Sequence, residues 1–100
     1  MDRTMRWNDM PIGVQISNIG SEVSRAIRWK NKNETEKMME FYRKAIELLK
    51  FTEEDPKNKN RINELRFCEE ELSDFFTGIN YYGTTQEQLE KYYDAFIMNQ

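Results

Sequence analysis

Apolar residues recur along the chain at steps of three and four, the spacing that places side chains on one face of an α-helix. Four such stripes follow one another and are separated by segments rich in polar residues, proline and glycine. They predict helices over residues 11–31, 34–52, 56–77 and 85–98. No segment alternates apolar and polar residues over a useful length, as a half-buried strand does. The pattern therefore predicts an all-α, antiparallel four-helix bundle over residues 11–100, preceded by a polar leader over residues 1–10.

Each predicted helix contributes one stripe to a shared core. The stripes are Ile12, Ile16, Ile19, Val23, Ala26 and Ile27; Met38, Phe41, Tyr42, Ala45, Leu48 and Leu49; Leu65, Cys68, Leu72, Phe75 and Phe76; and Leu89, Tyr92, Tyr93, Phe96 and Ile97. Gly13 and Gly20 border the first stripe, although glycine lowers helix propensity by up to about 1 kcal/mol relative to alanine. Close approach of a neighbouring helix is one explanation for them.

Capping residues mark the predicted helix ends. Asn33 stands before the second helix with Glu36 at the spacing of a capping box, and Asp55 precedes Pro56 at the start of the third. Gly78 is a natural stop, because glycine takes the left-handed conformation cheaply. Two overlapping capping boxes, Thr84 with Glu87 and Thr85 with Gln88, open the last helix.

The composition supports a packed core and excludes several classes of function. Hydrophobic residues make up 38% of the chain and aromatic residues 13%, which is unlike a disordered protein. The net charge of −3 counts against a dedicated nucleic-acid binder, since such domains usually run basic. The chain has no histidine, which removes Ser-His and Cys-His catalysis and histidine metal sites. We therefore expect no catalytic, metal or cofactor site, and we interpret Cys68 as a small core residue.

Acidic residues are densest over Glu69–Glu71 and at Asp74. Helical geometry spreads them around the third helix, with Glu70, Glu71 and Asp74 pointing mainly to solvent. We interpret them as a solvated face. An enzyme that relies on carboxylates alone stays as an alternative, which strongly raised pKa values in a cleft would favour.

The first ten residues are polar and charged, without the apolar run of an export signal, and no stretch approaches the roughly 20 apolar residues of a membrane span. The chain contains one cysteine and so cannot form an internal disulfide. These features predict a cytoplasmic protein with no membrane segment.

Several large side chains fall outside the core stripes and are candidate interface residues, since exposed aromatic residues tend to anchor interfaces. They are Trp29, Met39, Ile46, Phe67, Tyr81 and Tyr82. Met39 and Ile46 widen the stripe of the second helix. Phe67 with this spare flank predicts a surface for a homodimer or for a partner protein. Packing by the leader or by loops is the alternative.

Basic residues form two clusters, which are candidate contacts for an anion or a nucleic acid. The clusters are Arg25, Arg28, Lys30 and Lys32, and Lys57, Lys59 and Arg61. They need not share one end of an antiparallel bundle, so one continuous groove is not implied. Cations at a helix C-terminus also interact favourably with the helix dipole, which explains the first cluster without a ligand.

Three segments resemble a family of small, uncharacterised bacterial proteins: the run from Ile16 to Lys30, the segment from Asp55 to Asn58, and the ending from Leu89 to Phe96 with its Lys91-Tyr92-Tyr93. The resemblance implies a bacterial origin. It brings no established activity and so no site residues.

Two more remote resemblances imply alternative functions. In size and layout the predicted bundle is similar to HEPN-type helical domains, whose nuclease members use an Arg-x4–6-His motif that a chain without histidine cannot supply. This likeness implies a nucleic-acid-binding accessory protein without nuclease activity. The segment with Tyr42, Ala45, Ile46 and Leu48 before Asp55-Pro56 resembles a TPR-like hairpin, which implies a peptide-binding adaptor, although no 34-residue period repeats. Our leading expectation is a non-enzymatic protein that acts through protein–protein interaction.

Overall fold

The computed structural model describes residues 3–98, and among them the side chains of residues 6–96. The elements are α1 (Arg3–Asn8), α2 (Ile12–Asn31), α3 (Thr35–Glu54), the 3-10 helix η1 (Pro56–Arg61), α4 (Ile62–Thr77) and α5 (Gln86–Met98). This part of the chain contains no strand. The four long helices pack against one another, which confirms the prediction of an all-α bundle.

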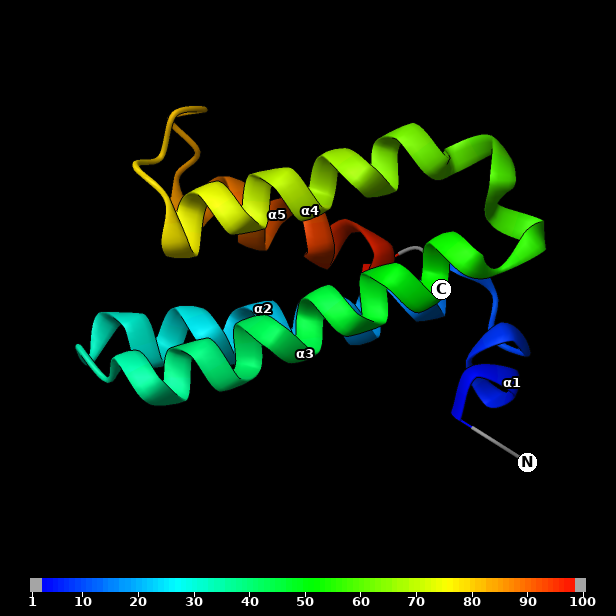
Figure 1. The fold of residues 1–100 in the computed structure, drawn as a ribbon, viewed down its shortest axis with the longest axis horizontal. Helices are drawn as coiled ribbons and strands as arrows, with labels where there is room; N and C mark the ends of the chain where they lie inside the picture. Colours follow the sequence, from blue (N-terminus) through cyan, green and yellow to red (C-terminus); the bar gives the residue numbers. More distant parts are fainter. Residues whose placement is uncertain (1–2, 99–100) are drawn as a thin grey trace.

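The long helices lie in two layers. Figure 1 shows the hairpin of α2 and α3 in one layer and α4 and α5 in the other, with α4 over α3 and α5 over α2. The α2–α3 turn and the loop over residues 78–85 lie at one end of the bundle, and η1 lies at the opposite end (Figure 1). None of the helices within residues 3–98 has an apolar stretch long enough to cross a membrane.

The core lies between these layers and is built from the predicted stripes. Its fully buried members come from all four long helices and include Ile19, Leu49, Leu72 and Leu89. Cys68 is also buried, as predicted for a small core residue. Ile97, predicted to extend the last stripe, has a side chain outside the described ones.

Helix α5 approaches α2 closely at Gly20. A Cβ atom built on this glycine would lie 2.6 Å from the Cβ atom of Tyr93, which is closer than such atoms pack. The Tyr93 side chain is itself buried. The interpretation of Gly20 as a point of close helix approach is therefore confirmed.

A buried polar network joins the N-terminal segment to the end of the bundle that carries η1. The Nε1 of Trp7 donates a hydrogen bond to Oγ1 of Thr52 (2.9 Å), and the amide of Gln15 donates to the carbonyl oxygen of Trp7 (2.8 Å) and to Asp55 (2.9 Å). The amide of Asn58 donates to Oε1 of Gln15 (2.9 Å). All five side chains are buried, so the indole of Trp7 belongs to the core although the residues around it read as a polar leader.

Two predicted helix starts are wrong in detail. Asn33 does not cap α3 with its side chain but takes a left-handed conformation (φ 59°) after α2, where its N–H donates to the carbonyl of Lys30 and that of Glu34 to the carbonyl of Trp29. This is the Schellman arrangement, which asparagine tolerates. The third predicted helix is split, because residues 56–61 form a 3-10 turn ahead of α4.

Other caps are confirmed. The Asp55 side chain accepts a hydrogen bond from the backbone N–H of Lys57. Thr85 and Gln88 form a reciprocal capping box, with bonds of 2.9 and 3.1 Å between side chain and backbone. Gly78 ends α4 but has φ −104°, so it does not use the left-handed conformation predicted for it.

The Gly20 contact predicts the effect of adding one methyl group. The substitution Gly20→Ala should lower the free energy of unfolding by about 1–3 kcal/mol, because the new Cβ forces Tyr93 or α5 to move. This loss should outweigh the gain in helix propensity. Urea unfolding measures it, and the exposed neighbour Ser21→Ala should stay within about 0.5 kcal/mol of wild type. Equal stability of Gly20→Ala and wild type would contradict the close approach.

Candidate functional site

The loop over residues 78–85 is held in shape by an acidic residue of α4. The two carboxylate oxygens of Asp74 accept hydrogen bonds from the backbone N–H groups of Tyr81 (2.7 Å) and Tyr82 (3.0 Å). The carbonyl oxygen of Asp74 accepts two more, from the N–H groups of Gly78 and Asn80. Asp74 therefore fixes the backbone of the loop at both tyrosines.

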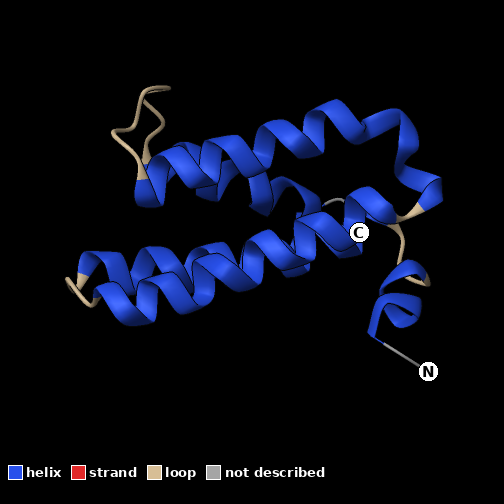
Figure 2. Cartoon of the chain, in the orientation of Figure 1, coloured by secondary structure: helices blue, strands red, loops and turns tan. Residues whose placement is uncertain are grey.

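Asn80 organises the second half of the same loop. It has a left-handed conformation (φ 56°), and its side chain bonds to both the N–H and the carbonyl of Thr84, at 3.0 Å each. Gly83 has φ 64°, which glycine adopts without strain, and its N–H donates to the carbonyl of Asn80. Asparagine and glycine are the residues that accept such a turn. In Figure 2 this ordered loop projects from one end of the helical body.

Four large apolar side chains on α4 and this loop are exposed. We call Phe67, Ile79, Tyr81 and Tyr82 the apolar patch; their exposed fractions are 45%, 89%, 80% and 46%. The ring of Tyr82 packs edge-on against Phe67 (5.3 Å between centroids) and against Tyr81 (5.5 Å). The three rings thus form one continuous surface. This surface contains three of the six candidate interface residues of the sequence analysis.

A pocket of about 480 Å³ opens beside this patch, between α4 and α5. We call it the α4–α5 pocket. Its lining consists of Glu64, Phe67, Cys68 and Glu71 of α4, Tyr82 and Thr84 of the loop, and Gln88 and Tyr92 of α5. The lining therefore combines three aromatic rings with two carboxylates and includes no basic side chain.

Hydrogen bonds fix the polar groups of the pocket. The hydroxyl of Tyr92 donates to Glu64 (2.7 Å) and lies 3.6 Å from the Cys68 sulfur, and the hydroxyl of Thr84 donates to Glu71 (3.0 Å). Burial raises the pKa of Tyr92, so its proton stays on the hydroxyl. Burial alone would raise the pKa of Glu64, but the bonds from Tyr92 and Arg61 outweigh it and lower the pKa. Glu64 is therefore a carboxylate at neutral pH.

Burial also raises the pKa of the Cys68 thiol, which is unfavourable for a nucleophile or a metal ligand. Within residues 3–98, no three cysteine or acidic side chains gather into a group that could hold a metal ion.

The acidic face of α4 differs from its predicted form. Glu70 is exposed, as expected, but Glu71 and Asp74 are half-buried and hydrogen-bonded to the loop. The prediction that these two residues point mainly to solvent is therefore wrong. Their carboxylates accept hydrogen bonds from the chain that crosses the end of α4.

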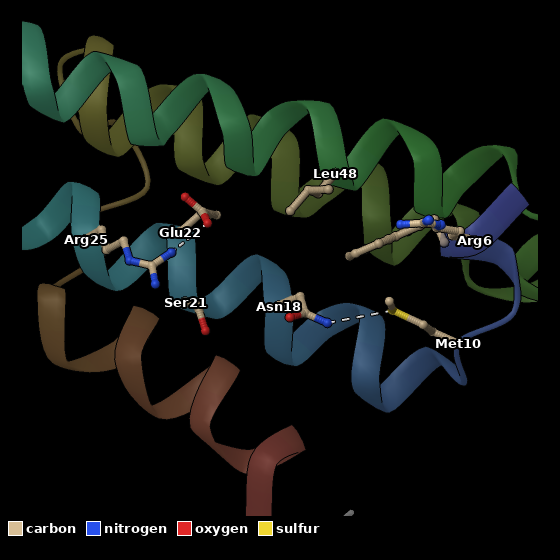
Figure 3. Close-up of a pocket in the computed structure, with 8 residues that line it drawn as sticks. Arg6, Met10, Asn18, Ser21, Glu22, Arg25 and Leu48 are labelled. Atoms are coloured by element: carbon tan, nitrogen blue, oxygen red, sulfur yellow. Dashed lines mark hydrogen bonds and ion pairs between the residues drawn. The ribbon is translucent and has the colours of Figure 1, made fainter. Parts of the chain in front are cut away.

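A second pocket, of about 340 Å³, lies near the N-terminal helix and is drawn in Figure 3. Arg25 pairs with Glu22, one turn earlier on α2, with 2.7 Å between Nη1 and Oε1. The Asn18 amide points to the Met10 sulfur (3.7 Å). Arg6 lines the opposite side. The pocket mixes cationic, anionic and apolar groups, and the acid in it is already paired with a base. It therefore does not favour one class of ligand.

The two basic clusters lie at opposite ends of the bundle. Residues 25–32 approach the α2–α3 turn and residues 57–61 form η1 (Figure 1). The structure therefore does not bring them into one groove. Several of these charges also have partners within the chain: Arg25 pairs with Glu22, Lys57 with Asp55, and Arg61 with Glu64.

The remaining candidate interface residues are covered in part. Trp29, Met39 and Ile46 are half-buried and pack against the core. The ammonium groups of Lys32 and Lys37 also lie over the Trp29 ring, at 5.0 and 4.3 Å from its centroid. Phe67 packs against Tyr82 on the side of α4 that faces the α4–α5 pocket.

A pair of acids joins α3 to α4 on another face. Burial first, and then the hydrogen bond and charge of Glu53, raise the pKa of Glu69 to about 7, although Lys50 and Arg66 act in the opposite direction. The Nε of Arg66 lies 3.5 Å from Oε1 of Glu53. The Glu69 carboxyl therefore keeps its proton to a higher pH than an exposed glutamate does.

Comparison with known proteins gives no relative to transfer a function from. No protein-family model matches the chain, and no curated protein or solved structure matches it either. The resemblances to small bacterial proteins, to HEPN-type domains and to a TPR-like hairpin therefore stay predictions.

Several residues of the site were not recognised from the sequence. They are Glu64, Glu71, Asp74, Ile79, Asn80, Thr84 and Tyr92. The signal for Asn80 and Gly83 was present, because Asn and Gly around two aromatic residues indicate a turn with left-handed residues. The roles of Glu71 and Tyr92 depend on how α5 is placed beside α4, which helical periodicity does not encode.

The Glu53–Glu69 pair predicts a pH dependence of stability. The pKa of Glu69 is raised by folding from 4.5 to about 7, so its contribution to stability is fully present below 4.5 and is lost as pH rises through about 7. The substitution Glu69→Gln imitates the protonated form and should flatten the change in unfolding free energy between about pH 4.5 and 7. Urea unfolding across this range measures it, with the exposed Glu70→Gln as control. Parallel pH profiles for wild type and Glu69→Gln would contradict the raised pKa of Glu69.

Proposed function

We propose that the chain is a non-enzymatic interaction module that binds a partner protein through the apolar patch. The observation that carries this proposal is the exposure of Ile79 (89%) and Tyr81 (80%) on a loop that hydrogen bonds hold in place. Exposed apolar side chains gathered in a patch, rather than scattered singly, mark interaction sites. Tyrosine and phenylalanine are also enriched at the centres of interfaces.

The ordered state of the loop adds to this argument. A loop whose backbone is held by Asp74 at both tyrosines has little backbone conformational entropy to lose on binding. Such preorganisation supports a binding role for the exposed side chains of this loop.

The charges around the patch support a basic partner rather than a second copy of this chain. Glu64, Glu70, Glu71 and Asp74 lie on the same side of α4 as the patch or line its pocket. A two-fold dimer through the patch would bring two such acidic surrounds together, which is unfavourable. The proposed partner therefore has an apolar contact surface with a basic rim.

The Glu53–Glu69 pair favours one second candidate, acid–base catalysis by carboxylates, because the pKa of Glu69 of about 7 suits such chemistry. The hollow beside the pair has Ile62 as its one apolar side chain among Lys50, Glu53, Glu54, Arg66 and Glu69. Substrate pockets are lined mainly by apolar and aromatic groups. The interaction module is therefore the preferred function.

The patch predicts which substitutions abolish partner binding. The double variant Ile79→Ser/Tyr81→Ser removes two loop side chains without touching the core, and it should weaken the partner's binding by at least about tenfold. Affinity capture from lysate, compared by mass spectrometry between wild type and variant, identifies the protein lost. The recovered partner's affinity is then measured by calorimetry.

The matched control is Met39→Gln, which alters a half-buried apolar side chain on α3, a helix that contributes no residue to the patch. A protein retained by this control and lost by the double variant supports the proposal. Retention of every captured protein by all three chains contradicts it. Light scattering that shows a wild-type dimer and a monomeric double variant would replace the proposed partner with a second copy.

A further inference from the structure

The α4–α5 pocket has the composition of a site for a positively charged side chain. Three aromatic side chains line it, Phe67, Tyr82 and Tyr92, together with the carboxylates of Glu64 and Glu71. Faces of aromatic rings attract cations through their quadrupole. A partly enclosed cavity also strengthens the field of the acids in its lining.

The carboxylates of the pocket keep capacity for a further donor. Glu71 accepts a hydrogen bond from Thr84 through Oε2 (3.0 Å), and a carboxylate has room for several more. Glu64 is shared between Tyr92 (2.7 Å) and Arg61, whose Nη2 lies 3.2 Å away at an exposed edge. Arg61 therefore offsets one of the two charges in part, and the charge of Glu71 is left for a ligand.

Several other aromatic rings of this chain are covered by cationic side chains of the same chain. Lysine or arginine side chains cover Trp29, Phe41, Phe75 and Phe96, at 4.3 to 5.9 Å from the ring centroids. Within the described part of the chain, no cation is found over Phe67, Tyr81 or Tyr82. The rings of Phe67 and Tyr82 line the acidic pocket, so a cation from another molecule can reach them there.

We propose that the α4–α5 pocket receives the guanidinium group of an arginine side chain from a basic segment of the partner protein. This inference rests on the proposed function and names the chemistry that the patch recognises. A guanidinium stacks on an aromatic face and pairs with a carboxylate through two parallel N–H groups, which an ammonium cannot do. Phe67 and Tyr82 supply the face, and Glu71 supplies the acceptor.

The test uses three short acetylated and amidated peptides of one sequence, Ser-X-Gly-X-Ser, in which X is arginine, citrulline or lysine. Citrulline keeps the shape of arginine without its charge. Each is titrated into ¹⁵N-labelled protein, and the shifts of the Tyr82, Thr84 and Gln88 amides are followed. The arginine peptide should shift these signals and bind roughly fivefold more tightly than either of the others.

Variants separate the pocket from general attraction to an acidic protein. With Glu71→Gln or with Phe67→Ala, the arginine and citrulline peptides should bind with about equal affinity. Glu36→Gln, which removes the same charge from the exposed start of α3, should leave the preference unchanged. A dispersed spectrum of each variant confirms that it is folded.

Equal binding of the arginine and citrulline peptides would overturn the inference, and so would shifts confined to other surfaces or no binding at all. Lysine binding as tightly as arginine would overturn the assignment to a guanidinium. These outcomes concern the pocket only. The proposed function fails separately, if the Ile79→Ser/Tyr81→Ser variant keeps every captured protein.

Discussion

The contact between Gly20 and Tyr93 determines where α5 can lie. Because residue 20 has no side chain, Tyr93 packs directly over the backbone of α2, and α5 is seated on that helix. Helix α4 packs instead on α3, so α4 and α5 lie over different helices of the α2–α3 layer (Figure 1). The pocket between α4 and α5 is the consequence, with Tyr92 as part of its wall.

The hydrogen-bond networks at the two ends of the bundle have different roles. At the end with η1, the chain must bury Trp7 with its indole N–H, and Gln15, Thr52, Asp55 and Asn58 supply the polar partners. This satisfied network is a structural device, since a buried polar group without a partner costs about 1–3 kcal/mol. At the other end, Asp74 and Asn80 hold a loop that carries exposed rings. Of the two ends, this is the one at which the described residues present large apolar side chains to solvent.

Helical periodicity is sufficient to predict the bundle, because each long helix buries one stripe against a common core. Ile19, Leu49, Leu72 and Leu89 are therefore found where their spacing places them. The capping interactions of Asp55 and Thr85 are equally local and were also predictable. Asn33 was misassigned because one residue can serve the end of one helix or the start of the next, and the short turn between α2 and α3 decides which.

The pocket could not be predicted in the same way, since its walls come from positions 64–71 of α4, from positions 82 and 84 of the loop, and from positions 88 and 92 of α5. Phe67, Tyr81 and Tyr82 were recognised as candidate interface residues because they fail to fit a stripe, which is a local property. The partnership of Glu71 with Thr84, and of Glu53 with Glu69, depends on the relative placement of helices. Residues of opposite functional character, such as a solvated acid and an acid that lines a pocket, look alike in the sequence.

The seating of α5 on α2 is the claim on which the pocket and its proposed ligand depend. A ¹³C-edited three-dimensional NOESY spectrum of protein labelled with ¹³C and ¹⁵N tests it most directly. The structure predicts strong cross-peaks between the α-protons of Gly20 and the β-protons of Tyr93. If the Gly20 α-protons instead show cross-peaks to Tyr92 and none to Tyr93, α5 is rotated on α2 and the α4–α5 pocket does not have the lining described.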